Sequence, residues 1–172
     1  MSLILRGLKP PDEEAFLTAY SETVSEVPNF AHYYQPGILF KDYLGVLADA
    51  KNGVGLAKDQ VPSTLLFGFV GRVIVGRLSL RHELSPFLEH EGGHIGYVVV
   101  PQFRGRGYAT EMLQQSLSMA RKLGLKNSLL TCDQNNAVSR RIIEKHGGKF
   151  ANEVTSLKSS KTVQRFWISL AP

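Results

Sequence analysis

The fold of this chain is decided by one stretch, residues 98–109, which reads Val98-Val99-Val100-Pro101-Gln102-Phe103-Arg104-Gly105-Arg106-Gly107-Tyr108-Ala109. An apolar run ends at Pro101, and a helical pattern of apolar residues begins just after Gly107. The stretch therefore predicts a strand, a glycine-rich turn and a helix in direct succession. The first amide N–H groups of a helix have no partner within it, and the helix dipole adds positive charge there. The turn is thus a predicted binding site for an anion.

The residues of the turn also suit an anion. Gly105 and Gly107 have no side chain, so an anion can approach the backbone closely. Arg104 and Arg106 add positive charge and hydrogen-bond donors. The turn is not a Walker loop, because no Gly-Lys-Ser/Thr follows it, and it is not a Rossmann fingerprint, because the third glycine is missing.

The rest of the pattern predicts an α/β fold with a mixed sheet of about seven strands flanked by about four helices. Strands are expected at 2–6, 64–70, 72–80, 94–100, 128–132, 149–154 and 162–170. Helices are expected between Pro10 and Pro28, at 41–50, after Gly107 and at 136–146, and residues 84–93 are expected to form a loop.

Composition places the chain among ordinary globular proteins. It has 172 residues, of which 43% are hydrophobic and 20% are charged, as expected for one domain spanning residues 1–172. The lone Cys132 excludes an internal disulfide framework and a multi-cysteine zinc site. No apolar run reaches the roughly 18 residues of a membrane span, and the N-terminus does not resemble a signal peptide. The chain is therefore expected to be cytoplasmic, without a membrane partner.

Charge is distributed unevenly along the chain. The net charge is +5, but residues 10–60 contain eight acidic residues and three lysines and so carry −5. The rest of the chain therefore carries +10. The basic part suits an anionic ligand and the acidic part a cationic one, unless both are merely solvated surface. A nucleic-acid partner is not expected, because the basic part lacks a recognition motif and interleaved aromatic residues.

Two motifs together resemble the GNAT superfamily of N-acetyltransferases. The first is the spacing Gln102-x-x-Gly105-x-Gly107 between a strand and a helix. The second is similar to the family's downstream helix, which begins with asparagine and ends in glycine, and it reads Asn136-Ala137-Val138-Ser139-Arg140-Arg141-Ile142-Ile143-Glu144-Lys145-His146-Gly147-Gly148. Residues 129–133, just before it, are similar to one bacterial branch of predicted acetyltransferases. The resemblance covers the chain from about Thr64 onward.

The resemblance implies that acetyl-CoA is the co-substrate, and no metal is expected. In the family the glycine-rich turn binds the coenzyme A pyrophosphate through backbone amides. The pantetheine arm lies between two splayed strands, here 94–100 and 128–132, and the backbone of residues 98–100 is expected to pair with it. The implied cofactor site consists of Val98, Val99, Val100, Gln102, Arg104, Gly105, Arg106, Gly107, Tyr108, Ala109, Thr110, Asn136 and Ser139.

The resemblance also implies that an amine attacks the thioester directly within a ternary complex. In many members a tyrosine on the downstream helix protonates the leaving thiolate, but the matching residue here is Ile143. The acid is therefore open, with Tyr97 and Tyr108 as possibilities. The candidates for the general base are His94, the first choice because it titrates nearest neutral pH, and Glu91, Glu89, Glu83 and His82. A His94→Ala change is expected to lower turnover and to spare acyl-CoA binding, although a structural role for His94 stays open.

Two further patterns carry less weight. The run His90-Glu91-Gly92-Gly93-His94 matches the H-E-x-x-H motif of zinc proteases, but its two glycines disfavour the helix that this motif needs. A loop that enters a strand is expected there instead. Cys132 is expected to be a packed thiol and not a nucleophile, because no histidine is placed to activate it.

The chain is therefore predicted to be an N-acetyltransferase that acts on a primary amine of a small molecule or a peptide. The acceptor is expected to enter between the N-terminal helices and residues 84–93, and the acidic residues of 10–60 favour a cationic acceptor. The alternative is a non-catalytic acyl-CoA-sensing module of the same fold, because Ile143 replaces the usual tyrosine. Both a monomer and a homodimer are open.

Overall fold

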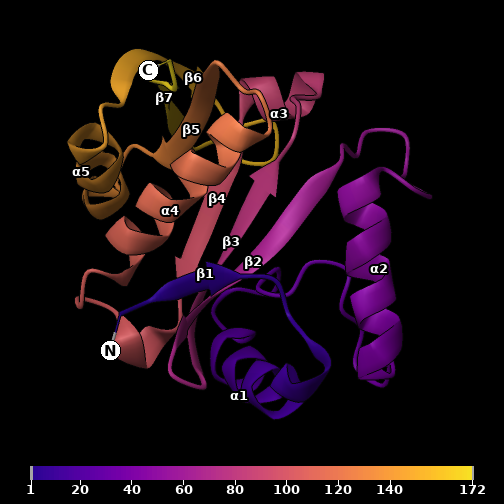
Figure 1. Cartoon of the computed structure of the whole chain (residues 1–172). Helices are drawn as coiled ribbons and strands as arrows, with labels where there is room; N and C mark the ends of the chain where they lie inside the picture. Colours follow the sequence, from indigo (N-terminus) through magenta and orange to yellow (C-terminus); the bar gives the residue numbers. More distant parts are fainter. Residues whose placement is uncertain (1, 172) are drawn as a thin grey trace.

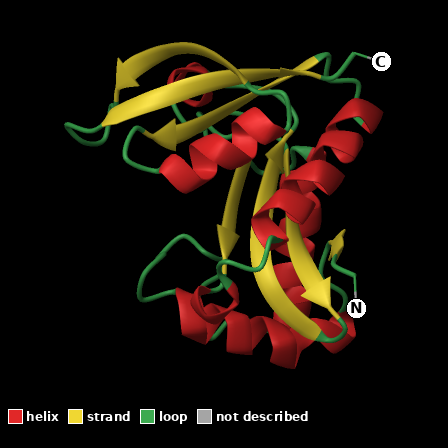
Figure 2. Cartoon of the chain, turned by 90° about the vertical axis from the view of Figure 1, so that its left-hand side faces the viewer, coloured by secondary structure: helices red, strands yellow, loops and turns green. Residues whose placement is uncertain are grey.

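The computed structural model describes residues 2–171, which contain seven strands in two antiparallel sheets. The first sheet has the order β1-β2-β3-β4, with β1 at Ile4–Arg6, β2 at Ser63–Val70, β3 at Val73–Arg81 and β4 at Ile95–Val99. The second has the order β5-β7-β6, with β5 at Asn127–Asp133, β6 at Lys149–Thr155 and β7 at Thr162–Ser169. Figure 2 shows the two sheets as separate groups of strands. The predicted mixed α/β fold is confirmed, but the strands do not form one continuous sheet.

Five α-helices accompany the strands within the described residues. They are α1 at Glu13–Thr23, α2 at Phe40–Asn52, α3 at Pro86–His90, α4 at Tyr108–Lys122 and α5 at Ala137–Lys145. The prediction of a loop at residues 84–93 is wrong for α3. There the Ser85 hydroxyl accepts a hydrogen bond from the N–H of Leu88, and Pro86 occupies the first helical position, so a single turn is well capped. Among residues 2–171, no helix is both long and apolar enough to cross a bilayer.

The first sheet separates two hydrophobic cores. On one face α4 packs Met112, Leu113 and Leu117, all buried, against Leu78 and Leu80 of β3. On the other face α1 and α2 enclose an aromatic cluster that includes Phe16, Tyr43 and Phe67. Figure 1 shows α1 and α2 on the lower right of the first sheet, and α4 and α5 on the upper left. Burying each large apolar side chain contributes about 1.5–3 kcal/mol, so α4 is firmly anchored.

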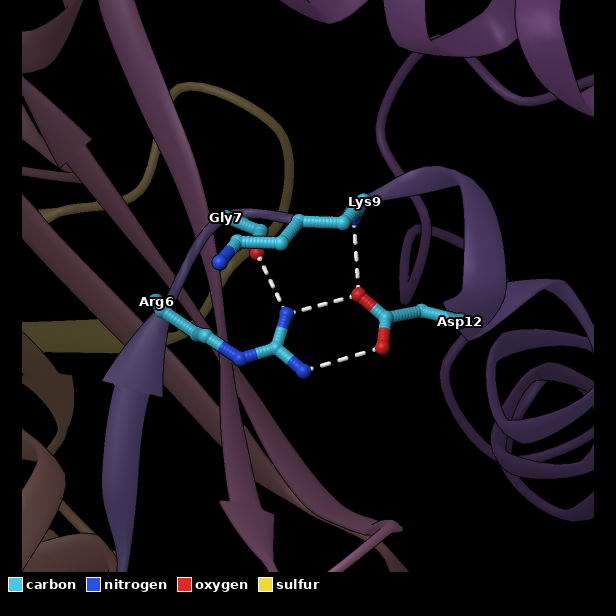
Figure 3. A network of polar contacts seen from close by, with 4 residues as sticks. All are labelled: Arg6, Gly7, Lys9 and Asp12. Carbon is cyan, nitrogen blue, oxygen red and sulfur yellow. Dashed lines mark hydrogen bonds and ion pairs between the residues drawn. The ribbon is translucent and has the colours of Figure 1, made fainter.

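An ion pair ties the end of β1 to the beginning of α1. Two nitrogens of Arg6 donate to the two carboxylate oxygens of Asp12, at 2.6 and 2.9 Å, and the N–H of Lys9 donates to the same carboxylate at 2.7 Å (Figure 3). The Arg6 guanidinium also stacks on the Phe69 ring at 3.6 Å. These contacts hold the pKa of Asp12 below its usual value, chiefly through the Arg6 hydrogen bonds. The charge of Asp12 is therefore fully engaged in fixing the first helix.

Candidate functional site

The two sheets are joined at a place that we call the seam, formed by His94 and Leu129. The N–H of His94 donates to the carbonyl oxygen of Leu129 at 2.7 Å, and the N–H of Leu129 donates to Nδ1 of His94 at 2.9 Å. Beyond the seam, within residues 2–171, the strand partner of β4 is β3 and that of β5 is β7, and β4 and β5 do not pair with each other. The two strands therefore diverge from the seam and leave a wedge between them, as predicted for strands 94–100 and 128–132.

The seam requires glycine at position 93. Gly93 has a positive φ of 63°, and a Cβ there would collide with the carbonyl oxygen of Leu129. Further hydrogen bonds hold this segment in place. The N–H of Gly92 donates to Thr131 Oγ1 at 3.0 Å, and Arg81 Nη1 donates to the carbonyls of Gly92 and Gly93. The segment that resembles a zinc motif is therefore the connection between the two sheets.

The edge of β4 that faces the wedge presents the backbone groups of Tyr97 and Val99. In an antiparallel pair, alternate residues bond to the neighbouring strand. His94 accepts from the N–H of Arg81 at 2.8 Å, and the N–H of Val100 donates to Val75 at 3.0 Å, so the even-numbered residues of β4 face β3. The prediction that the backbones of Val98 and Val100 pair with a pantetheine arm is therefore wrong, because β3 already uses them. The free groups belong to the odd-numbered residues.

The glycine-rich turn lies at the open end of the wedge. A 3-10 turn at Pro101–Phe103 follows β4, and α4 begins at Tyr108 with Gly107 as its N-cap. Gly105 and Gly107 have positive φ angles of 76° and 84°, which favour glycine. Within residues 2–171, no acceptor is bonded to the amides of residues 105–110. These amides, together with the helix dipole, are the groups that the predicted anion site needs.

The side chains of the turn divide into two roles. Arg104 forms an ion pair with Glu26 at 2.8 Å, and the Gln102 amide donates to Glu22 at 2.6 Å. These contacts connect the turn to α1 and the segment after it, so Arg104 and Gln102 position the turn. Arg106 lies over the Phe103 ring at 5.5 Å and pairs with no carboxylate among the described residues. Of the two arginines, Arg106 is therefore the one available to an anion.

A cavity of about 650 Å³ joins the turn to the wedge and to α5. At the start of α5, the Asn136 side chain caps the helix by accepting from the N–H of Ser139 at 3.0 Å. The cavity has the size of a site for a ligand as large as a cofactor. Val100, Gln102 and Arg106 are not among its lining residues. It is lined by Tyr97, Val98, Val99, Phe103, Arg104, Gly105, Gly107, Tyr108, Ala109, Thr110, Asn136, Val138, Ser139 and Ile142.

The sequence from residue 2 to residue 149 matches the acetyltransferase (GNAT) domain family. The chain belongs to the GNAT acetyltransferases. The predicted family is therefore confirmed, and with it the expectation of an acetyl-CoA-dependent N-acetyltransferase. No curated protein matches the sequence significantly.

Solved structures share this GNAT fold at low sequence identity. A putative acetyltransferase, YncA, from Salmonella typhimurium with acetyl-CoA is 16% identical, with a TM-score of 0.67 over 99% of this chain and 95% of that one. RimL, a ribosomal L7/L12 alpha-N-protein acetyltransferase in complex with coenzyme A, is 14% identical, with a TM-score of 0.70 over 98% and 94%. A spermidine N-acetyltransferase SpeG chimera, from Vibrio cholerae and hSSAT, is 14% identical, with a TM-score of 0.64 over 99% and 96%.

In this GNAT chain, the usual acid position is filled by a core residue. Ile143 on α5 is only 1% exposed and packs in the α4 core. Tyr97 lines the cavity, and its buried hydroxyl has no hydrogen-bond partner among the described residues. Burial raises the pKa of Tyr97, and the nearby Ser139 hydroxyl opposes that rise without meeting hydrogen-bond geometry. Sequence reasoning could name Tyr97 but had no signal for its unpartnered hydroxyl.

The candidates for the general base do not form a cluster. Glu91 Oε1 accepts from the N–H of Leu157 at 2.8 Å, so this buried carboxylate holds the loop between β6 and β7. His82 Nε2 lies 2.8 Å from Thr64 Oγ1 on β2. Glu83 and Glu89 are exposed. No hydrogen bond connects any two of these side chains or connects one of them to His94 within the described residues.

His94 is engaged through the nitrogen that a base would use. Because Nδ1 accepts from Leu129, the neutral ring carries its proton on Nε2 and has no free lone pair. Burial, and then the charge of Arg81, lowers the pKa of His94 to about 4. His90 is likewise occupied, with Nε2 at 2.9 Å from the carbonyl oxygen of Thr155. Among residues 2–171, no group of three potential metal ligands exists.

The seam role of His94 predicts a pH-dependent stability. Unfolded His94 gains a proton below pH 6.5, whereas folded His94 gains one only near pH 4, so stability is lost as pH falls through this window. In His94→Asn, the amide oxygen replaces Nδ1 as the acceptor without titrating. Urea unfolding between pH 7 and 4 is expected to show a steeper loss for the wild type, by at most about 1.4 kcal/mol per pH unit. If the free energy of unfolding depended on pH equally in the two proteins, this role of His94 would be contradicted. His32 titrates in both proteins, so its contribution cancels in the comparison.

Cys132 lies on β5 and is buried, as expected for a packed thiol. Burial raises the pKa of this thiol, and no histidine is bonded to it among the described residues. A thiol in this state is a poor nucleophile. The geometry therefore supports direct transfer more than an acyl-enzyme on Cys132.

Proposed function

We propose that acetyl-CoA binds with its pyrophosphate on the amides of residues 105–110 and with its pantetheine arm in the wedge between β4 and β5. The acetyl group is then transferred to a primary amine within a ternary complex. The observation that carries this proposal is the row of unpartnered amides at the open end of the wedge, continuous with a cavity of about 650 Å³. The arm would pair with the free edge of β4 at Tyr97 and Val99.

The chemistry needs few side chains once the reactants are aligned. The amine nitrogen attacks the thioester carbonyl carbon, and the carbonyl oxygen takes up negative charge. An N–H on the free edge of β4 stabilises that charge. The C–S bond then breaks, the thiolate takes up a proton, and the nitrogen loses a proton to a base or to water. The products are an N-acetyl amine and free coenzyme A.

Tyr97 is proposed as the acid that protonates the thiolate. It comes from β4 and faces α5, so it could replace the tyrosine that Ile143 displaces. A tyrosine hydroxyl is already protonated at neutral pH, and burial raises the pKa of Tyr97 further. This hydroxyl has no hydrogen-bond partner among the described residues.

Removal of the Tyr97 hydroxyl is expected to lower kcat by about 100-fold, the lower end of a general-acid contribution. Tyr97→Phe keeps the ring, so the Kd for acetyl-CoA is expected to stay within about twofold. Tyr108→Phe, which also removes a hydroxyl from the cavity lining, serves as the matched control. Equal kcat values for Tyr97→Phe and the wild type would remove Tyr97 from the mechanism.

An amine panel tests the proposed function as a whole. Free thiol is measured after acetyl-CoA is mixed with the protein and with polyamines, amino acids, amino sugars or peptides. Amine-dependent thiol release is expected for at least one class. Tight binding of acetyl-CoA without thiol release for any class would instead favour the acyl-CoA-sensing alternative.

A further inference from the structure

One face of β3 carries two arginines without an acidic partner. Arg77, Ser79 and Arg81 alternate along the strand and so lie on the same face. This is the face turned away from α4, which covers Leu78 and Leu80. Arg77 is only 5% exposed, and Arg81 is partly buried. Both guanidinium groups therefore lie in a poorly hydrated region.

Among the described residues, the hydrogen-bond acceptors of these guanidinium groups are all backbone carbonyls. Arg77 donates through Nε and Nη2 to the carbonyls of Phe30 and Asn29, each at 2.7 Å. Arg81 donates through Nη1 to the carbonyls of residues 92–93, at 3.1 and 3.0 Å. In the described part of the chain neither arginine forms an ion pair. A carbonyl satisfies a donor but has no formal charge, so two positive charges remain uncompensated at a cost.

The segment between α1 and α2 experiences this positive charge. Burial, and then the charges of Arg77 and Arg81, lower the pKa of His32 to about 3, so His32 is neutral at pH 7. Burial lowers the pKa of Arg77 to about 10, which leaves it charged at pH 7. The next residue, Tyr33, has a positive φ of 65°, a strained turn for a side chain of this size. The region therefore attracts an anion and repels a further cation.

Within the described residues, no acidic residue of 10–60 forms an ion pair with Arg77 or Arg81. Three of them are engaged with side chains outside it, and the other five are exposed. The engaged pairs are Asp12 with Arg6 (Figure 3), Glu22 with Gln102 and Glu26 with Arg104. The net charge of −5 was the basis for predicting a cationic acceptor, but within the described residues none of these acids forms an ion pair with Arg77 or Arg81.

Arg81 stands directly beside the strand that borders the wedge. Its Nη1 and Nη2 lie 3.7 and 4.0 Å from the position that a Cβ would take at Gly96 of β4. Its Nε and Nη2 donate to no acceptor in the described chain. We propose that the amine acceptor carries a carboxylate or a phosphate that binds at Arg81 beside the His32–Tyr33 turn, while its amine faces the wedge. This inference rests on the proposed acetyl transfer.

The first test compares related acceptors with and without an anionic group. An amino acid is paired with its carboxamide, and an aminoalkyl phosphate with the corresponding amino alcohol, and thiol release from acetyl-CoA gives kcat/KM. The anionic member of at least one pair is expected to have a kcat/KM at least about 10-fold higher, as for a charge-assisted hydrogen bond. The pair with the larger ratio distinguishes a carboxylate from a phosphate.

The second test changes Arg81. In Arg81→Gln the anionic-to-neutral ratio of kcat/KM is expected to fall towards one, and in Arg81→Lys it is expected to be retained in part. Arg72→Gln removes the same charge from the exposed turn between β2 and β3 and is expected to keep the full ratio. The Kd for acetyl-CoA shows that each variant is folded. Arg81→Lys keeps the test decisive if Arg81→Gln loses the contacts with residues 92–93 and fails to fold.

The outcomes separate this inference from the proposed function. Thiol release with polyamines or neutral amines, and ratios near one in every pair, would overturn the anionic acceptor and leave acetyl transfer intact. An unchanged ratio in Arg81→Gln would overturn the assignment to Arg81. Absence of thiol release with every amine would overturn the proposed function, and the inference with it.

Discussion

Gly107→Ala is expected to raise the Kd for acetyl-CoA by about 10- to 100-fold. Gly107 has a φ of 84° and is the N-cap of α4, immediately before the unpartnered amides at the start of the helix. A side chain there forces the backbone out of the left-handed region or strains it by about 1–2 kcal/mol. Either change misaligns amides whose hydrogen bonds to a charged group are each worth about 1.5–3 kcal/mol. Isothermal titration with acetyl-CoA measures the loss.

The opposite end of the same helix offers a matched control. Gly124 follows α4, has a φ of 87° and, like Gly107, has open space where a Cβ would lie. Gly124→Ala therefore imposes the same backbone strain away from the anion site. Both variants are expected to lose similar free energy of unfolding, but only Gly107→Ala loses affinity for acetyl-CoA. Equal affinities in the two variants would show that the pyrophosphate does not bind at the start of α4.

Gly93→Ala is expected to lower the free energy of unfolding by about 3 kcal/mol or more. The new Cβ collides with the carbonyl oxygen of Leu129, and the φ of 63° adds strain. The backbone cannot shift freely, because the neighbouring hydrogen bonds between His94 and Leu129, and between Gly92 and Thr131, depend on the same close approach. The seam opens, so weaker acetyl-CoA binding is expected as well.

Gly55→Ala is the control for strain alone. Gly55 has a φ of 65° and no neighbour within 4 Å of a Cβ. The Gly55→Ala variant is therefore expected to lose about 1 kcal/mol of the free energy of unfolding. Urea unfolding is followed by the fluorescence of Trp167, the sole tryptophan, whose ring centroid lies 6.4 Å from that of His94. If Gly93→Ala were no less stable than Gly55→Ala, the seam could not be as closely packed as described.

Local patterns in the sequence were enough to predict the strand, the glycine-rich turn and the helix that make up the proposed anion site. The strand that ends at Pro101, the two glycines and the apolar face of the following helix are all encoded within about twenty residues. Each of these features follows from local physical chemistry, because glycine tolerates positive φ and the start of a helix exposes its amides. The α4 helix and a helix beginning at Asn136 were predicted from similarly local patterns. The short helix α3 was missed because a single capped turn leaves too little periodicity to detect.

The parts that sequence could not predict depend on contacts between distant residues. From the sequence, His94 is a possible general base. In the structure it accepts a hydrogen bond from Leu129, thirty-five residues away, and so has a structural role. Arg104 reads as an anion ligand, but its partner Glu26 lies seventy-eight residues away. Net charge does not distinguish acids that already have partners from those that do not, so the cationic acceptor stays a prediction. Only the assembled fold shows that Arg77 and Arg81 form no ion pair within residues 2–171.

Transfer of a labelled acetyl group tests the central claim most directly. Acetyl-CoA labelled with a heavy carbon isotope at the thioester carbonyl is mixed with the protein and the best acceptor of the panel, and NMR follows the label. We expect the label to appear in an N-acetyl amide in equal amount to the free coenzyme A released, and to do so more slowly with Gly107→Ala at limiting acetyl-CoA. Label that appears as acetate, or that stays in the thioester while acetyl-CoA is bound, would contradict the account.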